Sequence, residues 1–221
     1  MSSYVLPGDS IPLNLILLPG EPDPKLILGP GLIRQDEDSA MSTKAGIPHS
    51  NETERKWFVE SNQRRYVPSA GEDVLGIITA KTSEYYRVDI GAAHAAVLDS
   101  LAFEGVTRRS KPNLKVGTLI YAQISEANKD IDAELTCINP ATNRADGYGV
   151  LDKGYIYMIK CSLGLCRRLR NEEHPIWTRL RQKYKFEVIV AVNGRICLKS
   201  NSARATIETI EIANAIKEHD V

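Results

Sequence analysis

The chain has 221 residues, and its 28 Lys and Arg balance 28 Asp and Glu, so the formal net charge is zero. This length suits one large domain or two to three small ones, and the composition is ordinary for a globular protein. The longest apolar run, residues 13–18, is interrupted by Asn14 and closed by Pro19. It is too short for a membrane span and follows no basic stretch, so we predict neither a membrane helix nor a signal peptide.

The charge is unevenly spread along the chain. Residues 1–66 carry 7 Lys and Arg against 9 Asp and Glu, and residues 67–147 carry 8 against 11. Residues 148–221 carry 13 against 8, which gives the C-terminal third a net charge of +5. Such a basic region is either a nucleic-acid face or a solvated surface that docks on an acidic partner.

The spacing of cysteine and histidine argues against a metal site. No two cysteines form a CxxC pair, and the histidines are scattered, whereas a metal site uses closer pairs with histidines nearby. We therefore predict no metal and no cofactor, with reduced cysteines in an intracellular protein. The residues concerned are Cys137, Cys161, Cys166, Cys197, His49, His94, His174 and His219.

Residues 1–66 are predicted to form a small all-β domain. Three motifs that combine Pro and Gly predict turns, and the apolar pieces between them have the length of strands. Residues 57–59 and 65–67 flank the polar sequence Ser-Asn-Gln, which predicts a hairpin. A domain this small is marginally stable alone, so we expect it to pack on another surface.

Residues 67–140 follow the pattern of a five-stranded OB-type barrel. Residues 74–80 are apolar and contain Gly76, which marks a bend at a barrel corner. Residues 85–91 alternate apolar and polar side chains, which predicts a half-buried strand. The longer connection between the third and fourth strands is typical of an S1 domain, which binds single-stranded nucleic acid. The three remaining strands are predicted at residues 95–98, 116–124 and 132–138.

A basic loop at residues 107–112 joins the third and fourth of these strands. It contains Arg108, Arg109 and Lys111. From their position alone, contact with RNA and simple solvation are equally good interpretations of these cations. Residues 139–149 contain Pro, Asn and Gly with little apolar content around them, and we predict a linker over residues 141–149.

Residues 150–221 are predicted to follow the order strand, helix, helix, strand, strand, helix, which is the order of a type I KH domain. Ser162 is a suitable N-cap for a helix through Leu169, and Pro175 suits the first turn of a second helix through Tyr184. The strands are predicted at residues 155–160, 186–190 and 195–198.

Two features of this C-terminal region extend the prediction. Asn193-Gly194 predicts a hairpin, because both residues tolerate positive φ. The last helix, starting near Ser202, has apolar residues on two sides, so we expect it to pack on its own sheet and on another surface. Those apolar residues are Ile207, Ile210, Ile212 and Ile216.

The loop between the first two predicted helices departs from the KH pattern. A typical KH domain clamps RNA with a GxxG loop. Residues 170–174 contain no glycine, and they carry the carboxylates of Glu172 and Glu173. These charges repel phosphates, so we predict that the usual KH grip on RNA is absent.

Short motifs spread in order over nearly the whole chain carry a resemblance to a known family. They lie at residues 28–32, 63–68, 76–81, 88–91, 101–105, 111–113, 116–117, 127–130 and 193–196. Together they resemble the S1/KH cap subunits of the eukaryotic RNA exosome. The resemblance implies an α+β multidomain protein with an N-terminal β domain, an S1 domain and a KH domain.

The resemblance also implies a function. Cap subunits of this family sit with other cap subunits on a ring of six catalytically inert RNase-PH-like proteins and guide single-stranded RNA into a channel. Associated exoribonucleases then degrade the RNA, in rRNA maturation and RNA turnover, in the nucleus, the nucleolus and also the cytoplasm. By this resemblance, Arg108, Arg109, Lys111 and Arg144 would face the RNA.

A structural motif of the family's KH domain has a counterpart here. The family carries a buried GxNG motif where this chain has Ala191, Val192, Asn193 and Gly194, with alanine in place of the first glycine.

Two other functional classes compete with a non-catalytic assembly subunit: a free-standing S1/KH RNA-binding adaptor, and an enzyme. Against the enzyme, the sequence has no clustered metal-binding carboxylates, Walker loop or nucleophile motif, so we predict no catalytic residue. Asp130 and Asp132 are close in sequence but straddle a turn into a strand. The small N-terminal domain and the broad apolar surface of the last helix favour an assembly subunit over an adaptor.

Overall fold

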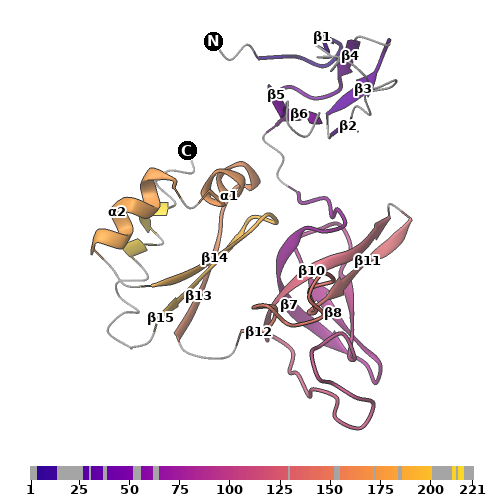
Figure 1. Ribbon diagram of the computed structural model, residues 1–221, viewed down its shortest axis with the longest axis vertical. Coiled ribbons are helices and arrows are strands. Elements are labelled where there is room, and N and C mark those ends of the chain that lie inside the picture. The colour runs from indigo at the N-terminus through magenta and orange to yellow at the C-terminus, as the bar shows by residue number, and fades with distance from the viewer. Residues whose placement is uncertain are drawn as a thin grey trace. The chain divides into compact units, whose positions relative to one another are not determined.

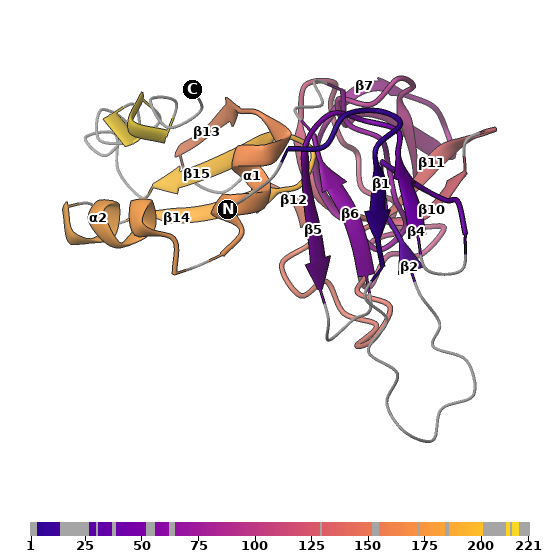
Figure 2. The ribbon, with the colours of Figure 1, turned by 90° about the horizontal axis from the view of Figure 1, so that it is seen from above.

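The chain forms two compact units, Met1–Asn62 and Gln63–Val221. Figure 1 labels their helices and strands, and Figure 2 gives a view from above. Among the described residues, no helix is both long enough and apolar enough to cross a membrane. The computed structural model describes residues 4–13, 27–29, 31–36, 39–51, 56–61, 65–128, 130–151, 155–171, 173–183, 186–200, 211–212 and 214–216.

The first unit contains two three-stranded sheets, as the prediction of a small all-β domain requires. In one sheet, β4 (Ser39–Ser42) lies between β1 (Ser10–Pro12) and β3 (Leu32–Arg34), and both pairings are antiparallel. In the other, β6 (Lys56–Glu60) lies between the parallel β2 (Ile27–Leu28) and the antiparallel β5 (Ile47–Asn51). The buried apolar cluster of this unit consists of Ile11, Leu13, Leu32, Ala40 and Val59.

The hairpin predicted around residues 61–63 is wrong. Residues 57–59 do lie in a strand, β6, but residues 65–67 lie in none. Strands β2 and β5 occupy both edges of β6, so no edge is left for a third partner. Tyr66 instead packs in the core of the second unit, where its hydroxyl donates to Glu72.

The second unit begins with the predicted five-stranded barrel. Its strands are arranged in the order β11-β9-β8-β7-β10, and a further pairing between β10 and β11 closes the sheet. The predicted bend residue, Gly76, allows a close approach: a Cβ added there would lie 2.2 Å from Cγ1 of Val88. The strands are β7 (Asp73–Lys81), β8 (Tyr85–Asp89), β9 (Ala96–Asp99), β10 (Leu119–Asn128) and β11 (Ile131–Thr136).

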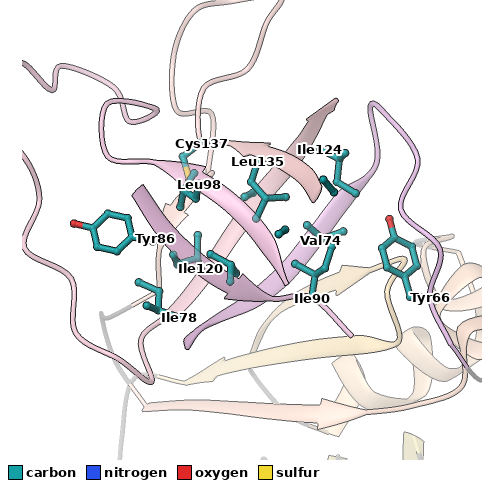
Figure 3. Close-up of a cluster of buried hydrophobic side chains, with 14 of the residues drawn as sticks. Tyr66, Val74, Ile78, Tyr86, Ile90, Leu98, Ile120, Ile124, Leu135 and Cys137 are labelled. Atoms are coloured by element: carbon teal, nitrogen blue, oxygen red, sulfur yellow. The ribbon is translucent and has the colours of Figure 1, made fainter. Parts of the chain in front are cut away.

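Alternating side chains of these strands fill the barrel. Tyr86, Val88 and Ile90 are at most 1% exposed, which confirms the alternation predicted for residues 85–91. Figure 3 shows side chains from different strands meeting inside the barrel. This packing excludes a channel through the barrel, so any ligand of the barrel has to bind on its outer face or its loops.

Residues 141–149, predicted as a linker, fold onto the barrel. They form turns that lead into β12 (Gly149–Val150), which pairs with β10. Tyr148 packs against the barrel core, and its ring lies 5.0 Å from that of Tyr121. The chain therefore enters the KH region from a fixed point on the barrel.

The KH region has the predicted order of elements as far as β15. Strand β15 (Arg195–Ser200) lies between β13 (Tyr155–Lys160) and β14 (Glu187–Ala191), with α1 (Leu163–Leu169) and α2 (Pro175–Lys183) beside the sheet (Figures 1 and 2). The predicted cap is confirmed, since Ser162 Oγ accepts a hydrogen bond from the Leu165 amide at 3.1 Å.

The predicted last helix is described only in part. Residues 211–212 and 214–216 are helical, and the buried side chains of Ile212 and Ile216 belong to the core formed with α1, α2 and the sheet. Ser202, Ile207 and Ile210 lie outside the described residues. The described part thus supports packing on its own sheet, while the second apolar surface stays a prediction.

Candidate RNA-binding loops and the junction behind them

The predicted basic loop is anchored to the turn between β7 and β8. Lys111 Nζ donates to the carbonyl of Ser83 at 3.1 Å, and the Tyr86 hydroxyl donates to the carbonyl of Pro112. One residue further on, the ammonium of Lys81 donates to Asn113. These three contacts hold the C-terminal end of the loop, from Lys111 to Asn113, against the barrel.

The remaining two cations of this loop point into solvent. Arg108 and Arg109 are exposed, and neither guanidinium has a hydrogen-bond or ion-pair partner in the described part of the chain. A turn, with Ser110 N–H donating to Thr107 at 3.0 Å, presents them together. These two charges on an anchored turn are available to bind phosphate groups. Lys111, in contrast, uses one of its N–H donors in the hydrogen bond to Ser83.

Arg144 lies in a second loop, which contacts the connection between β9 and β10 that contains Arg108 and Arg109. Its side chain is exposed, and its carbonyl accepts a hydrogen bond from the Asn139 amide at 2.8 Å. The next amide, that of Ala145, donates to Glu104 Oε2 at 2.8 Å. Since Glu104 lies four residues before Arg108, this bond joins the two loops that carry the predicted cations.

The two aspartates weighed as catalytic candidates do not form a metal centre. Asp132 Oδ2 lies 3.5 Å from Arg87 Nη1, a salt bridge on the outer face of the barrel. The amide of Asp130 donates to Asn128, and its side chain is exposed. Across the described residues, no group of three or more His, Cys, Asp or Glu is placed to hold a metal ion.

The predicted KH motif forms the junction with the barrel. Asn193 is 5% exposed, and its Nδ2 donates to the carbonyls of Leu75 and Ile90, both at 2.8 Å. Its Oδ1 accepts from the Leu75 amide at 3.3 Å. One side chain thus satisfies three backbone groups on β7 and just after β8, which the strand ladders leave without partners.

The other residues of the motif are also buried. Ala191 is fully buried and packs with Leu75 and Cys197 in an apolar cluster between the barrel and the KH sheet. Its φ is negative, so alanine fits this position without backbone strain. Gly194 has φ +76°, and a Cβ there would lie 2.8 Å from the Cys161 carbonyl oxygen. Both observations explain why the last position of the GxNG motif is a glycine.

A buried arginine strengthens the same junction. Arg195 is 4% exposed, and its Nη1 donates to the carbonyls of Asp89 at 2.6 Å and Leu75 at 3.2 Å. Its Nη2 lies 2.7 Å from Asp89 Oδ2. Burial of the Asp89 carboxyl acts to raise its pKa, but hydrogen bonds from the Gly91 amide and Arg195 outweigh burial and lower the pKa.

A second polar contact crosses the junction at Asp73. Its carboxylate accepts from the Tyr148 hydroxyl at 2.6 Å and from Arg170 Nη2 at 3.2 Å. Burial and this bond to Asp73 raise the pKa of Tyr148 above its ordinary value. The sequence analysis did not identify Asp73, Tyr148, Arg170 or Arg195 as junction residues. The one signal it offered was Arg195, a charged residue at the start of the apolar strand β15.

The loop between α1 and α2 offers no free amide for phosphate among its described residues. The amides of Arg170 and Asn171 donate to carbonyls of α1. Those of Glu173 and His174 donate to Asn171, at 3.0 and 3.1 Å. Glu173 is exposed, whereas Glu172 lies outside the described residues. The geometry agrees with the predicted absence of the usual KH grip, which itself stays a prediction.

Three family models match consecutive parts of the chain. The model described as Exosome complex exonuclease Rrp40 N-terminal domain matches residues 26–65. The model described as Exosome complex component RRP40, S1 domain, matches residues 66–149, and a KH domain model matches residues 157–204. The S1 and KH domains inferred from the strand and helix order are therefore confirmed.

Relatives of known name match nearly the whole chain. Exosome complex component RRP40 of Drosophila melanogaster is 41% identical over 97% of this chain and 88% of its own length. Exosome complex component rrp40 of Schizosaccharomyces pombe is 39% identical over 93% and 84%. A crystal structure described provisionally as an exosome complex RNA-binding protein is 26% identical, with a TM-score of 0.57 over 70% of this chain and 86% of that one. The chain belongs to the RRP40 family of exosome complex components.

Proposed function

We propose that the chain is a non-catalytic cap subunit of the RNA exosome that guides single-stranded RNA into the channel for 3'-5' processing and decay. The observation that carries this proposal is the pair of exposed guanidiniums of Arg108 and Arg109, which have no partner among the described residues, on an anchored loop of an RRP40-type S1 domain. Positive charge held at fixed positions binds the phosphate backbone of RNA without selecting a base sequence.

The proposed partners are the RNase-PH-like ring subunits, the other cap subunits and the associated exoribonucleases. The proposed locations are the nucleus, the nucleolus and the cytoplasm. Support for these partners comes from the relatives, which are named as exosome complex components. A free-standing adaptor, the alternative, would have the mass of the single chain, whereas a cap subunit would be part of a much larger complex.

The endogenous chain is expected to elute from size-exclusion chromatography of a lysate far above its own mass of 24.5 kDa. Affinity purification from the same fractions is expected to recover ring and cap subunits in fixed ratio to it. Elution near 24.5 kDa, without co-purifying subunits, would support the adaptor and reject the assembly role.

The purified chain is expected to show no ribonuclease activity in magnesium or manganese. The reason is that Asp132 is engaged by Arg87 and that, across the described residues, no group of three or more His, Cys, Asp or Glu is placed to hold a metal ion. Release of nucleotides from a labelled single-stranded RNA provides the measurement, with Asp130→Asn and Asp132→Asn as paired variants. Cleavage that persists through stringent purification and disappears in both variants would make the chain an enzyme.

A further inference from the structure

A groove of about 350 Å³ opens between the KH fold and the barrel, and none of its lining residues belongs to the basic loops. We call it the β14 groove, because three consecutive residues of that strand, Val188–Val190, line it. The other walls come from the helices, through Trp177 and Arg181 among others, and from Asp73 and Tyr121 of the barrel. The volume is roughly twice the ~150 Å³ that holds one benzene molecule in a protein core, so a large apolar side chain fits.

The groove runs along a strand edge. Successive side chains of a strand point to opposite faces, so a space that touches Val188, Ile189 and Val190 has to border the edge of the strand. All three residues are half-buried. In the described sheet, β14 pairs with β15 on one side only, and Figure 2 shows it at the margin of the sheet. An edge strand carries backbone N–H and C=O groups that can pair with another chain.

The rim of the groove carries one uncompensated positive charge. Arg170 shares its charge with Asp73, which lies 3.2 Å away. Arg181 is exposed, and within the described residues it has no hydrogen-bond or ion-pair partner. Apolar walls beside a single free guanidinium complement a segment that presents an apolar side chain next to a carboxylate.

The neighbouring loop argues against a nucleic acid as the occupant. The described amides of the α1–α2 loop are all engaged inside the protein, and Glu173 is exposed on it. A nucleic acid brings one negative charge per nucleotide, so its binding needs several hydrogen-bond donors or cations along the groove. An extended peptide binds through a free strand edge, and a single acidic side chain on it needs only one cation.

We propose that the β14 groove binds an extended acidic and apolar segment of a partner protein. The segment adds to the sheet as a fourth strand at the edge of β14, its apolar side chain enters the groove, and its carboxylate pairs with Arg181. This mode of recognition takes affinity from backbone hydrogen bonds and specificity from the pocket and the charge. None of the four proposed RNA-binding cations lines the groove, so the proposal goes beyond RNA guidance.

The test selects a phage-displayed library of random peptides against the full chain. Enriched peptides are expected to share an extended apolar pattern with one Asp or Glu. For the best synthetic peptide, Arg181→Gln is expected to weaken binding roughly fivefold, as for a partly solvated ion pair, and so is replacement of the peptide's acid by its amide. Arg181→Glu is expected to shift the preference to the same peptide with Lys at that position.

A matched control comes from the same helix. Arg179 is also exposed on α2 but does not line the groove, so Arg179→Gln is expected to leave peptide affinity unchanged. Hydrogen exchange on the complex is expected to show new protection of amides in β14 and none in β13, the other edge of the sheet.

Three results would overturn the proposal: no enriched peptide, equal losses for Arg179→Gln and Arg181→Gln, or bound peptide without protection of β14. Loss of single-stranded RNA binding on Arg181→Gln, with peptide binding unchanged, would assign the groove to nucleic acid instead. None of these results bears on the contacts of Arg108 and Arg109, so the proposed RNA role is tested separately.

Discussion

Asn193→Ala is expected to lower the free energy of unfolding of the second unit by about 2–6 kcal/mol. The substitution leaves the buried Leu75 amide and Ile90 carbonyl without partners, and each orphaned buried group costs about 1–3 kcal/mol. The Leu75 carbonyl keeps its bond from Arg195, so it adds little. Urea denaturation in a Trp57→Phe background measures the effect, because the remaining tryptophan, Trp177, is buried in the KH core.

The control for this variant is an exposed asparagine. Asn214→Ala removes the same amide from an exposed helical position and is expected to change stability by no more than about 0.5 kcal/mol. Asn193→Asp is expected to be worse than alanine, because it places a carboxylate against the carbonyls of Leu75 and Ile90. Equal stabilities for the alanine variants at 193 and 214 would show that the junction does not support the second unit.

Replacing Arg108, Arg109 and Arg144 together by glutamine is expected to reduce crosslinking of single-stranded RNA to the assembled complex at low salt. Each lost phosphate contact lowers the salt slope of single-strand binding by about 0.7, so the triple variant is expected to lose about 2. The fold is expected to persist, since exposed loop substitutions cost within roughly 0.5 kcal/mol. Crosslinking across a salt series, with complex integrity checked on the same samples, gives the measurement.

A charge-matched triple variant on the KH helices controls for net charge. Unchanged crosslinking of the loop variant at every salt concentration would reject the RNA role, and loss of the complex would reveal a subunit contact instead. Lys111→Gln is made separately, because its ammonium anchors the loop to Ser83 and its loss also loosens Arg108 and Arg109. The control substitutions are Arg167→Gln, Arg168→Gln and Arg179→Gln, all at exposed positions.

The elements that the sequence predicted well are those with local signals. Alternation in residues 85–91 gave β8, Ser162 gave the start of α1, and Pro175 gave the start of α2. Such signals depend on neighbouring residues only, and they decide secondary structure wherever tertiary packing agrees with them. The failed hairpin at residues 61–63 had local turn chemistry as well, but strands β2 and β5 already occupied both edges of its first strand.

The junction could not be predicted, because its partners are far apart in sequence. Arg195 lies in the motif at residues 193–196, yet nothing in its sequence neighbourhood indicates that its guanidinium donates to two carbonyls of the barrel. The hairpin at Asn193 illustrates the same limit. Of its central residues, only Gly194 has positive φ, in a three-residue turn between Ala191 and Arg195. Asn193 serves the junction through its side chain instead of serving the turn through its backbone.

The contacts of Asn193 with the barrel can form only late in the synthesis of the chain. Its partner Leu75 precedes it by 118 residues, and Ile90 precedes it by 103. A ribosome that adds about 5–20 residues per second adds Leu75 roughly 6–24 s before Asn193, and it completes the last barrel strand, which ends at Thr136, roughly 3–11 s before Asn193. During that interval the nascent barrel displays backbone groups that no strand of its own can satisfy. A message truncated before codon 193 therefore yields a barrel whose exposed amides and carbonyls are open to pairing with other nascent chains.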